Sequence, residues 1–136
     1  MAVLRASGEN FDVDMFSARS SIPIDRVYRR GEGLLGARKR SKHKVSGLAA
    51  TVSDASWLRL PLQIRDAEQF LLTYKREIMR LSRFPGVEDL VLEFSATIPF
   101  RRNFLTRTDR FPASLVRSTG KLGIALELRS YLTVSG

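Results

Sequence analysis

Apolar residues spaced for one long helix, between positions 60 and 81, constrain the fold of this 136-residue chain more than any other feature. They recur at alternating intervals of four and three residues: Leu60, Ile64, Ala67, Leu71, Tyr74, Ile78 and Leu81. This spacing puts them on one stripe of a helix, and such a stripe has to be covered. Pro61 is tolerated in a first turn, and Pro85-Gly86 ends the helix. We therefore expect one continuous helix packed on a sheet. Three more apolar residues should widen its buried stripe: Phe70, Leu72 and Met79.

Five other segments have the alternation or the composition of β-strands. They cover residues 2–7, 25–30, 44–53, 89–98 and 124–132. The second of these segments is polar enough to lie on a solvated edge of the sheet. In the last segment, the alternation places Ile124, Leu126 and Leu128 on the inward face.

Two short helices complete the pattern. Asp12 suits an N-cap, and Phe11 before it is placed to pack against Phe16 in the first turns of the helix. This helix must end before the Ile-Pro pair that follows, because a residue preceding proline is pushed out of the helical conformation. The second helix has Pro112 near its start and Gly123 just past its end.

The resulting order is β-α-β-β-α-β-α-β, and its first six elements match the split β-α-β arrangement of ferredoxin-like folds. We therefore expect one α+β domain over residues 1–136, with an antiparallel or mixed sheet and helices on one face. The last helix and strand would be a C-terminal α-β extension of the ferredoxin-like core. The content of 43% hydrophobic and 27% charged residues is typical of a globular chain.

The net charge of +9 is concentrated in one connection. Eight Lys/Arg and a single acid, Glu32, lie between Arg26 and Lys44, a net of +7 that leaves +2 for the rest of the chain. Within this segment, residues 31–44 form a basic, glycine-containing loop. The cations in and just before this loop, together with two from a later loop, are candidates for binding the phosphates of nucleic acid or another polyanion. These candidates are Arg29, Arg30, Arg38, Lys39, Arg40, Lys42, Lys44, Arg101 and Arg102. The alternative is a solvated loop, because it lacks the interleaved aromatic residues that stack on bases.

The same segment contains Gly31, Gly33 and Gly36, the G-x-G-x-x-G spacing of a dinucleotide site. A working copy needs a buried apolar strand before it and a packed helix after it. Here the preceding strand is polar, and no apolar residue lies between Arg38 and Lys44. A phosphate loop fails as well, since Ala-Arg follows Gly36 where Lys and Ser or Thr are required. We therefore expect no nucleotide cofactor.

No residue pattern indicates catalysis. The chain has no cysteine, and its one histidine, His43, lies between two lysines that would repel a metal ion. Asp12 and Asp14 are close in sequence, but a capping role explains them better than a pair of catalytic carboxylates. Trp57 is expected to anchor the start of the long helix. We therefore expect no catalytic residue, no metal and no cofactor. An enzyme remains open as an alternative, with a substrate pocket that no spacing demands and that would be lined by Tyr28, Arg29, Asp54 and Arg102.

The absence of an apolar run of membrane-spanning length favours a soluble, cytoplasmic protein that does not bind membranes. Its first expected function is that of a small interaction or accessory protein, for example an immunity-type protein that blocks a protein partner. Binding of nucleic acid or another polyanion through Arg26–Lys44 is the alternative. The edges at residues 25–30 and at the last strand could each support a homodimer.

Three stretches resemble a group of small, mostly bacterial proteins known as the domain of unknown function 4279 family. They are LRASGENFDVDMF near the start, DRVYRRGE in the middle, and FPASLVRSTGKLGIALELRSY near the end. In such proteins an Arg/Lys-Gly-Glu follows the second strand, which here is Arg30-Gly31-Glu32. A proline-led helix then runs through a Leu-Gly turn into the last strand. The resemblance implies a compact α+β domain and carries no activity, cofactor or catalytic residue.

Overall fold

The computed structural model describes residues 1–33, 41–99 and 106–133. Its strands are β1 (Ala2–Gly8), β2 (Arg26–Tyr28), β3 (Ser46–Ser53), β4 (Asp89–Pro99) and β5 (Ala125–Thr133). Its helices are α1 (Val13–Ser17), α2 (Leu60–Thr73), α3 (Lys75–Ser82) and α4 (Ala113–Leu122). The expected α+β class is confirmed. No helix within the described ranges is long and apolar enough to cross a membrane.

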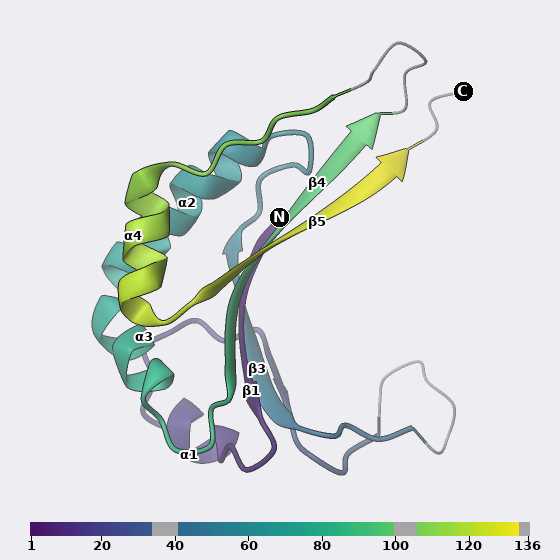
Figure 1. Cartoon of the computed structure of the whole chain (residues 1–136). Helices are drawn as coiled ribbons and strands as arrows, with labels where there is room; N and C mark the ends of the chain where they lie inside the picture. Colours follow the sequence, from purple (N-terminus) through teal and green to yellow (C-terminus); the bar gives the residue numbers. More distant parts are fainter. Residues whose placement is uncertain (34–40, 100–105, 134–136) are drawn as a thin grey trace.

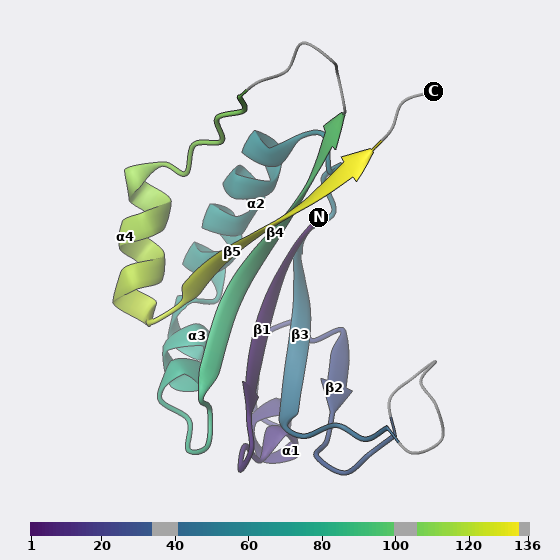
Figure 2. The ribbon, with the colours of Figure 1, turned by 45° about the vertical axis from the view of Figure 1, so that its right-hand side comes forward.

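The five strands form one mixed sheet in the order β2-β3-β1-β4-β5. Neighbouring strands are antiparallel except for β4 and β5, which are parallel because α4 carries the chain back between them. Figures 1 and 2 show all four helices on one side of the sheet. None of the helices of the described residues lies over the opposite side, which is called here the uncovered face.

The alternation along the central strands decides which face is buried. In β1, Leu4 and Ala6 point to the helices and are almost fully buried, whereas Val3, Arg5 and Ser7 are half-buried on the uncovered face. The paired registers with β3 and β4 carry the same division across the sheet, except at Val91, which lies opposite Arg5 on the uncovered face and is buried. The core therefore lies between the sheet and its helices, as the strand periodicity predicts.

The prediction of one continuous helix over residues 60–81 is wrong, because the chain forms two helices. Tyr74, with φ −108° and ψ 21°, interrupts the helical conformation between α2 and α3. Just before it, Thr73 Oγ1 donates to the Gln69 carbonyl at 2.9 Å, a local bond that bends helices. The buried stripe nevertheless continues through the break, with Leu71 before it and Ile78 after it.

Leu72 does not widen the buried stripe as predicted. It is 70% exposed, because it lies about 100° around the helix from Leu71, which is buried. The other two residues assigned to the stripe do contact the core: Phe70 is buried, and Met79 is partly buried against it.

The short helix α1 follows its sequence signals. Asp12 accepts a hydrogen bond from the Met15 backbone N–H at 3.0 Å, as an N-cap should. The rings of Phe11 and Phe16 lie with centroids 6.3 Å apart, and Phe84 packs edge-on against both. The Arg80 guanidinium stands 4.2 Å from the centroid of the Phe16 ring and covers this cluster.

The C-terminal pair of elements also follows its signals. Pro112 is the N-cap of α4, and Gly123 ends the helix at φ 70°, a left-handed conformation that favours glycine. Of the apolar residues assigned to the inward face, Ile124 is buried, but Leu126 and Leu128 are only half-buried. The reason is their position, since β5 is an edge strand of the sheet.

Trp57, in the segment just before α2, contacts the sheet. Its ring stacks on the ring of Tyr131 in β5, with centroids 4.8 Å apart and 16° between the planes, and Trp57 remains 40% exposed. The Trp57 carbonyl accepts a bond from the Thr97 N–H at 3.0 Å. Trp57 thus joins the segment between β3 and α2 to β4 and β5.

Candidate functional site

Five of the nine cations assigned to polyanion binding lie outside the described residues. They are Arg38, Lys39, Arg40, Arg101 and Arg102. The remaining four lie around the end of β2 and the return of the chain toward β3: Arg29, Arg30, Lys42 and Lys44. The structure therefore brings these four to one end of the sheet.

Two of these four cations are already held by acids. Arg29 bonds to Asp14 at 2.6 Å and to Glu32 at 3.1 Å, and Arg30 lies 3.4 Å from Glu9. The hydrogen bond from Arg29 lowers the pKa of the Asp14 carboxyl, and the same contact raises the pKa of Arg29. The number of Lys and Arg residues in this segment therefore overstates the positive charge that is available to a polyanion.

Lys42 and Lys44 are exposed and form no ion pair with any residue in the described ranges. They flank His43, whose backbone N–H donates to the Glu32 carbonyl at 2.8 Å, and Gly33 is bridged to Lys42. The two arms of the connection are therefore paired at its base. Gly33 lies in this antiparallel bridge, whereas Gly36, the third glycine of the G-x-G-x-x-G spacing, lies outside the described residues.

Tyr28 fixes the base of this connection to the uncovered face. Its ring stacks on His43 with centroids 4.7 Å apart, and Arg26 stands 5.5 Å from the ring centroid. Beneath the ring lies Gly47, where an added Cβ would overlap the Tyr28 side chain and the Ala6 carbonyl. The ring of Tyr28 is thus already in contact with His43 on one side and with Gly47 of β3 beneath it.

The middle of the uncovered face carries a row of paired charges. Arg5 lies 3.5 Å from Glu93 and 2.8 Å from Glu127, and Arg129 lies 2.9 Å from Glu93. Two cations and two acids balance, so this part of the face has no net charge. It therefore does not offer the positive track along which a nucleic-acid backbone binds.

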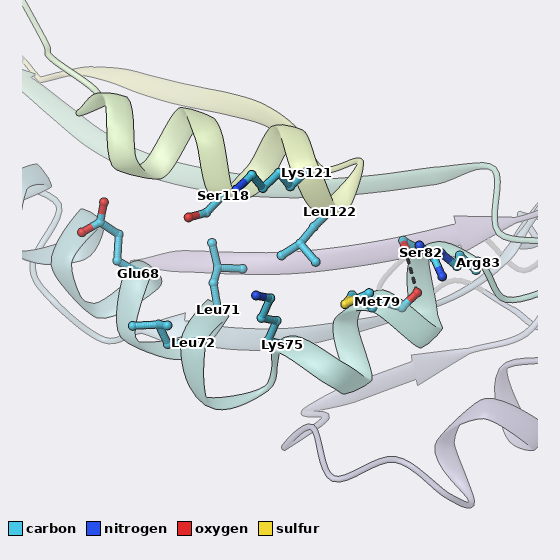
Figure 3. Close-up of a pocket in the computed structure, with 10 residues that line it drawn as sticks. All are labelled: Glu68, Leu71, Leu72, Lys75, Met79, Ser82, Arg83, Ser118, Lys121 and Leu122. Carbon is cyan, nitrogen blue, oxygen red and sulfur yellow. Dashed lines mark hydrogen bonds between the residues drawn. The ribbon is translucent and has the colours of Figure 1, made fainter.

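A groove on the other side of the molecule combines apolar surface with unpaired cations. It has a volume of about 310 Å³ and lies between α2–α3 and α4. Figure 3 shows Ser118 and Lys121 approaching it from α4, opposite Leu71, Lys75 and Met79 from the paired helices. This volume is at the lower limit for ligand pockets and accommodates a few apolar side chains.

The floor of the groove is aliphatic and its rim is cationic. Leu71 and Leu122 are buried beneath it, and Leu72 is exposed at its side. Its rim bears three exposed cations, none of them in an ion pair within the described part of the chain: Lys75, Arg83 and Lys121.

The single acid of the groove, Glu68, accepts a bond from Ser114 Oγ at 2.6 Å. Net positive charge over an apolar floor suits an anionic, amphipathic ligand. The groove residues supply no nucleophile–base pair. In the described ranges no group of three or more His, Cys, Asp or Glu residues could hold a metal ion.

The sequence analysis did not identify this groove. Lys75 and Arg83 are eight residues apart, a spacing that places both on one helical face, and this signal was present in the sequence. The position of Lys121 opposite them could not be inferred, because it depends on how α4 packs against α2 and α3. Comparison with family models, curated proteins and solved structures finds no match to this chain.

Proposed function

We propose that the protein is a non-catalytic binding protein that docks an acidic, amphipathic segment of a protein partner in the groove between α2–α3 and α4. The observation that carries this proposal is the set of three unpaired cations around an aliphatic floor: Lys75, Arg83 and Lys121. A partner would insert apolar side chains between Leu72 and Leu122 and place its carboxylates beside the cations.

In this proposal the apolar floor and the charged rim of the groove have different physical roles. Apolar side chains that fill a preformed recess contribute most of the binding energy at an interface. Charges at its rim speed association and select partners of opposite sign. Here Leu71 and Leu72 provide the apolar surface of the recess, and the three cations provide the charged rim.

The proposal includes the finer expectations drawn from the sequence. An immunity-type role fits a partner whose docking segment is acidic, and we place the protein in the cytoplasm. A ferredoxin-like core is supported by the order β2-β3-β1-β4 with antiparallel neighbours, to which α4 and β5 add an extension. Membership of the domain of unknown function 4279 family is part of the same proposal.

The test uses a fluorescein-labelled synthetic peptide that repeats Leu and Glu at helical spacing. Anisotropy titrations with the full chain should show saturable binding that weakens with salt. A second peptide with Lys in place of every Glu should not bind. The triple variant Lys75→Glu, Arg83→Glu, Lys121→Glu should weaken binding of the acidic peptide at least about tenfold.

A matched control reverses the same number of charges on the same helical layer but outside the groove, in Arg65→Glu, Arg76→Glu, Arg117→Glu. This control should retain most of the affinity. If both triple variants lost the same affinity for the acidic peptide, net charge alone would explain the loss, and the groove proposal would be overturned. Binding of a small amphiphile such as dodecanoate, without binding of the acidic peptide, would assign the groove to a small molecule instead.

A second candidate function is polyanion binding through the segment Arg26–Lys44. The exposure of Arg26, Lys42 and Lys44 at one end of the sheet favours it, since none of them pairs with an acid in the described ranges. Affinity for RNA or DNA should then fall steeply as salt increases, because bound phosphates release counterions.

The variant for this second function is Arg38→Ala, Lys39→Ala, Arg40→Ala, Lys42→Ala, Lys44→Ala, which should abolish binding. The groove variant with Lys75, Arg83 and Lys121 replaced should bind nucleic acid almost as the unchanged chain does. No detectable complex with RNA or DNA at low salt would eliminate this function. The two candidates are thus separated by which set of cations each ligand requires.

A further inference from the structure

The sheet has two edges, and only one of them is long enough to accept another strand along its length. The strand β2 is only three residues long, and a very short edge strand offers little to pair with. The strand β5 is nine residues long and contains no proline, and among the described residues it pairs on one side only, with β4. An unblunted edge of this kind is a template for pairing with another strand.

We propose that β5 pairs with β5 of a second copy of this chain, antiparallel and centred on Leu128, to form a two-fold dimer with a continuous ten-stranded sheet. In this register Leu128 faces the partner's Leu128, and Glu127 faces the partner's Arg129. The proposal does not depend on the groove, which lies on the helical side.

The charges of β5 favour this register over its neighbours. A centre on Glu127 would place two glutamates opposite each other, and a centre on Arg129 would place two arginines opposite each other. Like charges directly opposite on adjacent strands are unfavourable, whereas opposite charges stabilise the pair. Only the centre on Leu128 gives two opposite-charge pairs, one on each side of the two-fold axis.

The row of charges on the uncovered face would continue across the new interface. Within one chain, Arg5 bonds to Glu127 at 2.8 Å and Arg129 bonds to Glu93 at 2.9 Å. The row therefore ends at the edge strand with one acid and one base, side by side. A two-fold operation places the base of each copy next to the acid of the other, so the alternation of sign is kept.

The apolar residues of β5 also match themselves in this register. On the helical side, the half-buried Leu128 would face its equivalent. Leu132, which is 66% exposed, would lie opposite Ile124, the buried residue that precedes β5 in the other copy. On the uncovered face, Tyr131 would face Ala125, so a large side chain lies beside a small one. Exposed apolar area on both sides of β5 is thus covered, which favours a second copy as the occupant of this edge.

The first experiment uses charge complementation, measured by analytical ultracentrifugation. The unchanged chain should sediment as a dimer. Glu127→Arg would place arginines opposite each other, Arg129→Glu would place glutamates opposite each other, and each variant alone should dissociate at least about tenfold more readily. Their equimolar mixture should restore dimers, because each Arg then faces a Glu.

Restoration in the mixture separates an interface effect from misfolding, since two misfolded chains would not rescue each other. The double variant Lys42→Glu, Lys44→Glu, at the far end of the sheet, serves as a control and should remain dimeric. A monomer for the unchanged chain at high protein concentration would overturn the proposal. Dimers in both single variants would likewise overturn it, because the interface would then lie elsewhere.

The second experiment tests the register and uses the absence of cysteine from the chain. A single Leu128→Cys substitution should form an intermolecular disulfide under mild oxidation, because the two sulfurs would meet on the two-fold axis. Leu132→Cys on the same face of the same strand should form it poorly, although position 132 is more exposed. Faster cross-linking at position 132 would indicate random collision and contradict the register.

Discussion

Arg29 forms two hydrogen bonds with the carboxylate of Asp14, from Nε at 2.8 Å and from Nη2 at 2.6 Å. This bidentate pair joins the residue that follows β2 to the first turn of α1. A planar guanidinium and a carboxylate suit each other in this geometry. The most basic segment of the chain is therefore tied to the folded body at its first end, and one of its cations is neutralised there.

The first prediction concerns the titration of Asp14. The hydrogen bond from Arg29 lowers the pKa of this carboxyl below its ordinary value of 3.8. The pair therefore contributes stability above that value and loses it as the pH falls through the lowered pKa. Carbonyl-carbon NMR titration should find the lowered pKa, and Arg29→Ala should return it toward 3.8. An unchanged Asp14 titration in the Ala variant would contradict the pairing.

The second prediction compares two glycines. Gly47→Ala should destabilise the fold by about 1 to 3 kcal/mol, because its Cβ would overlap the Tyr28 ring and the Ala6 carbonyl. Gly120→Ala should instead stabilise it by about 0.5 to 1 kcal/mol, since this glycine lies within α4 with nothing close to its Cβ position. Urea unfolding of both variants measures the difference. The same sign for both would refute the packing assigned to Tyr28.

The third prediction concerns a buried amide. Gln63 in α2 is fully buried, and its Nε2 donates to the Ser95 carbonyl at 2.8 Å and to the Ser56 carbonyl at 3.0 Å. Gln63→Leu should cost about 1 to 3 kcal/mol of unfolding free energy, because a side chain of similar size removes both donors. Gln69→Leu, at an exposed position of the same helix, should change stability little. Thermal unfolding of both variants provides the test, and equal stabilities would speak against the buried contact.

The fourth prediction compares two adjacent leucines at the groove. Leu71 is 3% exposed, so Leu71→Ala should destabilise the fold by about 2 to 5 kcal/mol. Leu72 is 70% exposed, so Leu72→Ala should change the free energy of unfolding by less than about 0.5 kcal/mol. The same Leu72 variant should weaken binding of the acidic peptide. A destabilisation by Leu72→Ala as large as that by Leu71→Ala would place Leu72 in the core.

Local patterns were sufficient to predict most elements of this fold. The N-cap at Asp12, the helix led by Pro112 and ended by Gly123, and the alternation of β1 and β4 depend on neighbouring residues in the chain. Such signals act over one or two turns or along one strand, so they can be read without knowing what lies opposite. The break at Tyr74 escaped prediction because the apolar spacing continues through it unchanged.

The candidate sites show the limit of that information. The amino-acid sequence alone determined the class of the fold, the buried faces of its strands and helices, and the concentration of charge between Arg26 and Lys44. Tertiary structure alone decided that Arg29 is neutralised by Asp14, that Lys121 lies across a groove from Lys75, and that β5 pairs with β4 in parallel. The physical reason is that periodicity records which side of an element avoids water, whereas pairing and edges depend on where distant elements meet.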